Sequence, residues 1–409
     1  MWYNIYRKEE VSLILNTKQE AGLREVIERY NNNEMYSCIA GFAGTGKSTL
    51  VAFIIDAIGL DREEEVCYAA YTGKAANVLK RKGCPNASTI HRLIYNAIPR
   101  KDGTFYFKVK ERLDKPYKLI VIDEVSMVPE HMWETLLGYG IHILALGDPG
   151  QLPPVKALDN GILEHPHVFL DEVMRQEDTS DILRLSMDVR DKKPLKYFKG
   201  NDVRVISWDE YRNNMGVLGW ADQIICAKNA TRIGLNAQMR YDLFGWEDPL
   251  PQDGDKIICT RNNWNIANFY GDSLINGVTG VISDIEYKDR ENFCYTPTMF
   301  ANFIPDYYDL NNEREKIWGT FCHVRMDRKL FIEGEPLVNR NNFSRIPSQL
   351  KPNEFDFGYA ITCHKAQGSE FEKVLVFEEY LKGDNADSHA RWLYTAITRA
   401  SKKLVIIKA

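Results

Sequence analysis

The segment from 41 to 48 reads GFAGTGKS and fits the pattern G-x-x-x-x-G-K-[ST]. In this pattern the backbone N–H groups of a glycine-rich loop surround the β-phosphate of a nucleoside triphosphate. The side chain of Lys47 can reach the β- and γ-phosphates, and the hydroxyl of Ser48 can bind Mg²⁺. We therefore predict a nucleoside triphosphate and Mg²⁺ site formed by Gly41, Gly44, Thr45, Gly46, Lys47, Ser48 and Thr49.

Two later apolar runs end in side chains that suit hydrolysis of a γ-phosphate. The run LIVIDEVSM (119–127) ends in adjacent carboxylates. Asp123 would hold Mg²⁺ through its hydration shell, and Glu124 would polarise the attacking water. The run LALGDPGQLPPV (144–155) places Gln151 at the tip of a rigid turn, where its amide can contact the γ-phosphate or the water. An acidic turn and an ordinary loop are the alternative interpretations.

The elements around these residues alternate short apolar runs with helical stretches. From 35 to about 178 the apolar runs are MYSCIA, CYAAYT, KLIVID and HILALG, and an apolar helix is expected at 49–58. This alternation predicts a parallel, doubly wound sheet with functional loops at the carboxyl ends of its strands. A second set of buried-type strands is expected at 221–229, 255–262, 372–379 and 402–409, with helices at 230–243 and 386–400. Two similar α/β domains are the simplest interpretation.

Two stretches interrupt this alternation. Residues 95–117 contain an Asp102-Gly103 turn followed by alternating Phe105, Phe107 and Val109, which predicts a projecting β-hairpin. Residues 282 to about 354 are rich in aromatic, β-branched and turn residues and lack helical periodicity, which predicts a small all-β insertion.

Composition indicates an ordinary soluble protein of 409 residues, with 44% hydrophobic and 27% charged residues. The eight cysteines form no C-x-x-C pair, so we expect reduced thiols in cores and a reducing, cytoplasmic location. The first residues, MWYNIYRKEE, are charged where a secretory leader is apolar, and no membrane span is expected. A net charge of −5 means that any nucleic-acid binding must come from a local groove.

The order of motifs resembles that of superfamily 1 helicases. It comprises the phosphate loop, YTGKAA (71–76), STIHRL (88–93), VIDEVSM, GDPGQLPPV, VMRQ (173–176), YAITCHKAQGSEFEKV (359–374) and YTAITRA (394–400). More narrowly, TGKAA, TIHRL and HKAQG resemble the RecD and bacteriophage Dda branch. The resemblance implies an ATP-dependent DNA helicase that moves 5′ to 3′ on single-stranded DNA.

The resemblance also implies a fold and its boundaries. Two RecA-like (P-loop NTPase) α/β domains would occupy 1–94 with 118–178, and 179–281 with 355–409. The hairpin at 95–117 would be a wedge inserted in the first domain. The all-β stretch at 282–354 would be a barrel-like insertion in the second.

Further site residues are implied by the same resemblance. Gln19 would read adenine, because a side-chain amide can donate to and accept from the base edge. The alternative is an ordinary polar helix residue. Arg175 and Arg399 resemble arginine fingers, with a surface salt bridge as the alternative for each, and Arg399 can reach the nucleotide only when the two domains close. Gly368 and Glu370 resemble positions near the γ-phosphate and the ribose.

The motifs that would touch the DNA strand have small polar side chains at loop ends, which suit contact with a nucleic-acid backbone. The candidates are Thr72, Lys74, Thr89, His91, Asn229, Thr362 and His364. The threonines could instead cap helices, and the histidines could be structural. Phe105, Tyr106 and Phe107 could form a wedge against duplex DNA or simply pack the hairpin onto its domain.

Two other functions share the phosphate loop. A switch or remodelling ATPase without unwinding activity would not need the full hydrolytic set of Glu124, Gln151 and two arginines. A small-molecule kinase would leave the second α/β domain unexplained. The expected partners are single-stranded DNA, single-strand/duplex junctions and replication or recombination proteins, with no membrane and a monomeric chain.

Overall fold

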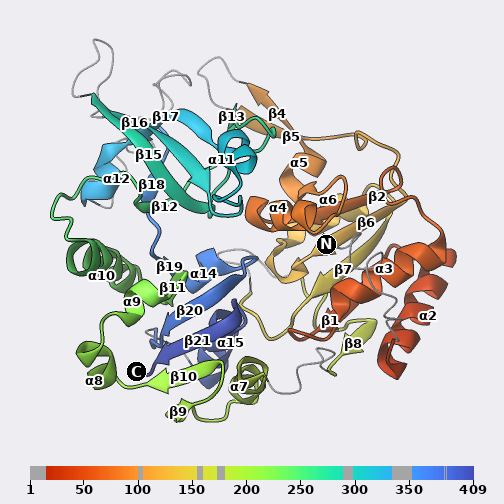
Figure 1. Ribbon diagram of the computed structural model, residues 1–409. Coiled ribbons are helices and arrows are strands. Elements are labelled where there is room, and N and C mark those ends of the chain that lie inside the picture. Colours follow the sequence, from red (N-terminus) through yellow and green to blue (C-terminus); the bar gives the residue numbers. More distant parts are fainter. Residues whose placement is uncertain are drawn as a thin grey trace.

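The computed structural model describes residues 15–99, 105–153, 160–172, 180–288, 298–333, 352–381, 383 and 385–409. Three main sheets organise these residues (Figure 1). Two α/β units lie side by side, one formed by the red to yellow part of the chain and one by the green and blue parts (Figure 1). The third sheet, in cyan and teal, lies above the second unit and reaches toward helices of the first (Figure 1).

The first sheet has six parallel strands in the order β3-β2-β6-β7-β1-β8. Its strands are β1 (Tyr36–Gly41), β2 (Val66–Ala70), β3 (Ser88–Thr89), β6 (Leu119–Asp123), β7 (His142–Gly147) and β8 (Val168–Leu170). Its helices are α2 (Thr17–Asn31), α3 (Lys47–Ile58), α4 (Gly73–Arg81), α5 (Ile90–Ile94), η1 (Val125–Met127) and α6 (Glu130–Leu137). One core packs α2, α3 and α4 on one face, and another packs α5 and α6 on the other, so the sheet is doubly wound as predicted.

The second sheet has the order β19-β11-β20-β21-β10-β9 and is parallel except for the β9–β10 pair. Its strands are β9 (Phe198–Lys199), β10 (Val203–Ile206), β11 (Gln223–Cys226), β19 (Ala360–Thr362), β20 (Phe371–Phe377) and β21 (Ala400–Ile407). Its helices are α7 (Asp181–Arg190), α8 (Trp208–Asn213), α9 (Val217–Trp220), α10 (Asn229–Gln238), η2 (Met239–Leu243), α14 (Cys363–Ala366) and α15 (Ala386–Ile397). Together the two sheets confirm the prediction of two α/β units.

The third sheet is antiparallel, with the order β17-β16-β15-β12-β18. Its strands are β12 (Lys256–Cys259), β15 (Thr279–Lys288), β16 (Thr298–Pro305), β17 (Phe321–Asp327) and β18 (Phe355–Phe357). A two-stranded ribbon and two short helices accompany it: β13 (Asn263–Ala267), β14 (Ser273–Leu274), α11 (Glu313–Gly319) and α12 (Arg328–Glu333).

Two expectations for this part of the chain are wrong. The strand expected at 255–262 in the second α/β sheet is β12, which pairs with β15 and β18 in the third sheet. A short apolar run is buried in either sheet, so its composition could not distinguish them. The stretch expected to be all-β also contains α11 and α12, which are too short to give a helical pattern in the sequence.

The hairpin prediction is confirmed by β4 (Tyr95–Pro99) and β5 (Phe105–Val109), which pair antiparallel from Tyr95 with Val109 to Pro99 with Phe105. The Asp102-Gly103 turn lies outside the described residues. The described cysteines are free thiols, and all but Cys322 are buried, as expected for core cysteines. Within the described ranges, no helix is long and apolar enough to cross a membrane.

Candidate active site

The phosphate loop connects β1 to the first turn of α3. Gly44 and Gly46 have φ values of 79° and 77°, a region in which residues with a Cβ are strained. The hydroxyl of Thr45 donates to the carbonyl of Phe42 at 2.9 Å and closes the loop on itself. Helix α3 begins at Lys47, so its free N–H groups and its dipole face the position of a bound phosphate.

Lys47 is folded back onto its own loop. Its Nζ donates to the carbonyl of Gly41 at 2.6 Å and to that of Phe42 at 3.0 Å. These carbonyls hold the ammonium group in place of phosphate oxygens. Binding of a nucleotide would therefore move the Lys47 ammonium from the loop backbone to the phosphates.

The carboxylates of Asp123 and Glu124 follow β6 at the carboxyl edge of the first sheet. Asp123 Oδ1 accepts from the backbone N–H of Glu124 at 2.9 Å. Glu124 adopts a left-handed conformation with φ 54° and ψ 48°, which is strained for a residue with a side chain. This conformation lets two consecutive side chains line one cavity, together with Lys47 and Ser48.

Burial and the neighbouring charge of Glu124 raise the pKa of Asp123 to about 6. The adjacent carboxylates of Asp123 and Glu124 favour binding of a cation between them and the phosphates of a nucleotide. The hydroxyl of Ser48 and the carboxylate of Asp123 are the hard oxygen donors that Mg²⁺ prefers, and both line the same cavity. The residues present therefore fit the expected metal ion.

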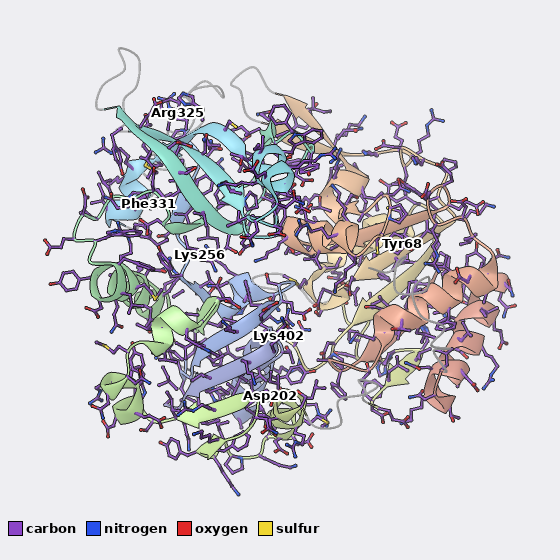
Figure 2. All side chains as sticks on the ribbon, viewed as in Figure 1. Tyr68, Asp202, Lys256, Arg325, Phe331 and Lys402 are labelled. Atoms are coloured by element: carbon purple, nitrogen blue, oxygen red, sulfur yellow. The ribbon has the colours of Figure 1, made fainter. Side chains whose placement is uncertain are left out.

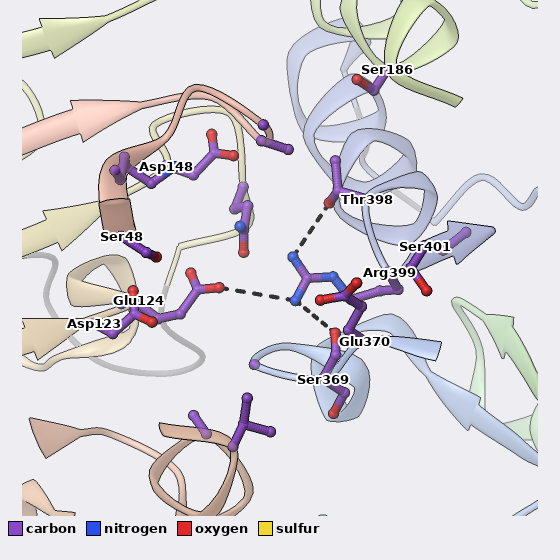
Figure 3. Close-up of a pocket in the computed structure, with 18 of the residues that line it drawn as sticks. Ser48, Asp123, Glu124, Asp148, Ser186, Ser369, Glu370, Thr398, Arg399 and Ser401 are labelled. Carbon is purple, nitrogen blue, oxygen red and sulfur yellow. Dashed lines mark hydrogen bonds and ion pairs between the residues drawn. The ribbon is translucent and has the colours of Figure 1, made fainter. Parts of the chain in front are cut away.

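Arg399, which lies just after α15, enters this cavity from the second α/β unit (Figure 3). It is 5% exposed, and its guanidinium lies 4.0 Å from Glu124 Oε1. Its Nε donates to the carbonyl of Thr395 at 3.1 Å and its Nη1 to that of Ser369 at 3.2 Å. These bonds aim the guanidinium at the first unit.

Gln151 joins the two halves of the cavity. When its amide is oriented so that both of its ends are satisfied, its nitrogen donates to Glu124 Oε2 at 3.3 Å and its oxygen accepts from Arg399 Nη2 at 3.1 Å. The carboxylate of Glu124, the amide of Gln151 and the guanidinium of Arg399 thus form one connected network. The cavity holds about 210 Å³ and is lined by both α/β units.

Comparison with known proteins agrees with this geometry. The profile of the AAA domain family matches residues 14–204, and that of the UvrD-like helicase C-terminal domain matches residues 357–407. The ATP-dependent DNA helicase dda of Enterobacteria phage T4 is 29% identical over 94% of this chain and 97% of its own length. The ATP-dependent RecD2 DNA helicase of Deinococcus radiodurans is 26% identical over 88% of this chain, which spans 45% of that relative.

A solved structure of Pif1 helicase from Bacteroides, in complex with ADP-AlF3 and ssDNA, has the same fold, with a TM-score of 0.53. It is 16% identical and covers 97% of this chain and 92% of its own. Along both α/β units the chain is similar to superfamily 1 helicases. The remaining predicted residues can now be placed on the two α/β units.

Gln19 lies beside the phosphate loop but makes structural contacts. Its Oε1 accepts from the backbone of Asn16 at 3.1 Å in a capping box at the start of α2, and its Nε2 donates to the carbonyl of Thr45 at 3.2 Å. Recognition of adenine by Gln19 stays a prediction. Gly368 and Glu370 both line the cavity, whereas Arg175 lies outside the described residues.

The threonines predicted to contact DNA lie where β-strands of the two α/β sheets end. Thr72 and Thr89 follow or end the neighbouring parallel strands β2 and β3, and their hydroxyls cap α4 and α5. Thr362 ends β19 without a side-chain capping bond, and the exposed Asn229 follows the adjacent strand β11. The capping interpretation thus holds for the first two, while DNA contact stays a prediction for all four.

Lys74 is buried between the first unit and the third sheet rather than exposed on a surface. Its Nζ donates to Thr279 Oγ1 at 3.2 Å, lies 4.0 Å from Asp306 Oδ1 and sits 4.7 Å from the ring centre of Phe371. Burial lowers the pKa of Lys74. Contact of Lys74 with DNA stays a prediction, and it would require these contacts to open.

The aromatic residues of the hairpin form a cluster at its base. Phe107 is 49% exposed, yet its ring packs in T-shaped arrangements with His91 and Tyr95 at centroid distances of 6.3 and 6.1 Å. Tyr106 is also exposed. For Phe105 the structure describes only the backbone, in β5. The ring of Phe107 therefore packs against the first α/β unit on one side and is exposed to solvent on the other.

Both histidines of the predicted DNA track are partly buried. Burial lowers the pKa of His91 and that of His364. Each imidazole is therefore expected to be neutral near pH 7, which suits hydrogen bonding or stacking better than pairing with a phosphate charge.

Three residues that contribute to the site were missed in the sequence. Asp148 and Tyr394 share a hydrogen bond of 2.7 Å between the two α/β units, and Thr395 Oγ1 accepts from the backbone of Leu152 at 3.0 Å. All of them lie inside motifs already singled out, at GDPGQLPPV and YTAITRA. The available signal was a carboxylate directly after a buried strand and a tyrosine in the mostly apolar end of a helix, WLYTAI (392–397).

Proposed function

We propose that the chain is an ATP-dependent DNA helicase that steps along single-stranded DNA from 5′ to 3′ and unwinds duplexes. The observation that carries this proposal is the cavity between two α/β units, with Glu124 and Arg399 on opposite sides and Gln151 bonded to both. A site divided in this way is completed or broken by motion of one unit relative to the other. Hydrolysis can therefore be converted into movement along a strand.

The roles of the chain's own groups follow from their positions. Lys47 transfers from the loop carbonyls to the β- and γ-phosphates, and Glu124 orients and polarises the attacking water. Arg399 stabilises the negative charge that spreads over the transferring phosphoryl group. Ser48 and Asp123 would hold Mg²⁺, which when bound neutralises charge on the phosphates.

The proposed DNA track follows the carboxyl ends of the strands in both units. Thr72 and Thr89 lie at this edge of the first sheet, and Asn229 and Thr362 lie at the same edge of the second. We infer that the strand crosses both units along these ends, with the hairpin at the junction with duplex DNA. The relatives dda and RecD2, both described as ATP-dependent DNA helicases, support DNA as the substrate.

One set of assays tests this proposal. ATP turnover should rise severalfold or more when single-stranded DNA is added, and a duplex with a 5′ tail should be unwound in preference to one with a 3′ tail. Turnover that is indifferent to DNA would refute the motor. Stimulated turnover without strand displacement would favour a switch or remodelling ATPase, and displacement confined to 3′-tailed duplexes would reverse the polarity.

The oligomeric state has its own measurement. We propose that a single chain is the working unit at the junction. Sedimentation on a forked DNA substrate should give one chain per fork, and a unit of two chains at the lowest active concentration would refute this part of the proposal.

A further inference from the structure

The hydroxyl of Tyr394 connects three segments that are distant in sequence: its own helix α15, the loop that begins at Asp148 and the phosphate loop. It donates to Asp148 Oδ2 at 2.7 Å, and it accepts from the backbone N–H of Ala43, in the phosphate loop, at 3.1 Å. Tyr394 belongs to α15 of the second unit, and both its side chain and that of Asp148 are almost fully buried. Its hydroxyl is therefore a fixed connection between the two units next to the nucleotide cavity.

The Phe42–Ala43 peptide group links this connection to Lys47. The carbonyl of this peptide accepts from Lys47 Nζ at 3.0 Å, and its N–H donates to Tyr394. When Lys47 leaves for a phosphate, the carbonyl loses its charged donor and keeps the hydroxyl of Thr45. Because the N–H and C=O of one peptide lie in one rigid plane, we expect this loss to alter the bond to Tyr394 as well.

The other end of the connection reaches Arg399. Arg399 Nε is bonded to the carbonyl of Thr395, the residue after Tyr394, so the guanidinium is held against the last turn of α15. A shift of α15 at Tyr394 therefore moves Arg399 relative to Glu124. Tyr394 lies in the path between the group that senses phosphate and the group that stabilises the transition state.

The loop that carries Gln151 is attached to the same helix. Leu152 accepts from Gln367 Nε2 and donates to Thr395 Oγ1, each at 3.0 Å. A Cβ on Gly150 would lie 2.9 Å from the Tyr394 ring, so a glycine is required for this close packing. Loop 148–152 belongs to the first unit by sequence, but many of its contacts are with the second.

We propose that Tyr394 is a positioning residue that transmits the nucleotide state of the phosphate loop to α15, and thereby sets the position of Arg399. The proposal rests on the proposed ATPase function only for its kinetic consequence. Its structural core, a coupling between nucleotide binding and α15, requires neither DNA nor hydrolysis. Tyr394 acts through Arg399 and is not itself a catalytic residue.

Tyr394→Phe is the direct test, because it removes the hydroxyl and keeps the ring that packs on Gly150. Tyr211→Phe is the matched control, since Tyr211 is also a buried tyrosine of the second unit with one side-chain hydrogen bond, to Gln238 at 2.9 Å. Hydrogen–deuterium exchange of residues 386–397 is measured with and without Mg²⁺ and a non-hydrolysable ATP analogue. The affinity for the analogue is measured in parallel.

In the wild type and in Tyr211→Phe, the analogue should change exchange across α15. In Tyr394→Phe this change should disappear while affinity stays within about threefold, since the lost hydroxyl does not touch the nucleotide. An unaltered response in Tyr394→Phe would overturn the proposal, and so would a wild type that binds the analogue without any response in α15. A response without DNA-stimulated turnover would refute the proposed function and leave the coupling standing.

Kinetics provide a second, independent test. Loss of a hydrogen bond to a buried carboxylate should lower kcat about tenfold with little change in KM. In an Arg399→Ala background, measured by single-turnover hydrolysis, Tyr394→Phe should have almost no further effect, because the route through Arg399 is already broken. A tenfold effect that persists in that background would show that Tyr394 does not act through Arg399.

Discussion

Arg399→Ala tests the divided active site most directly. The guanidinium of Arg399 lies 4.0 Å from Glu124 and is bonded to Gln151 at 3.1 Å, so its removal takes the second unit's positive charge out of the site. Lys47, Ser48 and Asp123 stay in place. Nucleotide binding should therefore be largely retained while hydrolysis is lost.

The size of the effect follows from the role of the group. An arginine that meets the transferring phosphoryl group contributes about 10³- to 10⁵-fold to kcat. Because Gln151 would still hold Glu124, we expect the lower end, about 10³-fold, or about 4 kcal/mol of transition-state stabilisation. The bonds to the carbonyls of Thr395 and Ser369 are also lost, at a cost of about 1 kcal/mol each, so the fold should survive.

The assay is steady-state ATP turnover at saturating single-stranded DNA, alongside binding of a fluorescent nucleotide. Arg391→Ala is the control, because Arg391 lies on the same helix but pairs only with Asp387 among the ion pairs of the described residues, on the exposed surface. It should leave turnover within about twofold. Wild-type turnover by Arg399→Ala in the presence of DNA would refute the two-unit site.

Three further predictions concern other parts of the chain. Lys47→Ala should abolish measurable ATP turnover, because the segment 41–48 contains no other lysine to contact the phosphates; DNA-stimulated phosphate release from this variant would contradict the assignment. Phe107→Ala should reduce strand displacement severalfold and leave DNA-stimulated ATPase within about twofold, since the ring is half exposed on the hairpin; equal losses in both assays would contradict a wedge. Lys256, between the second and third sheets (Figure 2), has a pKa that burial lowers to about 8. Between pH 8 and 10.5 the unfolded chain therefore binds more protons than the folded chain, so the stability of the folded state rises with pH. The melting temperature of the wild type should rise relative to that of Lys256→Met as the pH increases from 7.5 to 9.5. A difference in melting temperature that does not change with pH would contradict this prediction.

Much of the candidate site could be predicted because its parts are local. The phosphate loop needs positive φ values at Gly44 and Gly46 and a helix that starts at Lys47, and eight consecutive residues specify all of this. To predict the positions of Asp123 and Glu124, it was enough to recognise a buried strand that ends in carboxylates. These features depend on backbone geometry within a few residues, so residue type and spacing suffice to recognise them.

Other features were not predictable because they depend on packing partners. Lys74 stands in a motif that predicts DNA contact, and its burial against Thr279 and Phe371 could not be read from that motif. The strand β12 has the composition of an α/β strand, and it pairs in the antiparallel sheet because β15 and β18 lie on either side of it. In both cases the sequence specifies the chemical character of the segment but not the strand or surface against which it packs.

The sequence alone therefore determined that the chain binds a nucleoside triphosphate, that it has two α/β units and which motifs lie at their strand ends. Only the tertiary structure decided that Arg399 meets Glu124, that Gln151 bridges them and that Tyr394 bonds to Ala43, 351 positions away in the chain. The physical reason is range. Local backbone preferences and apolar periodicity act over a few residues, whereas contacts between units depend on how two separately formed surfaces fit together.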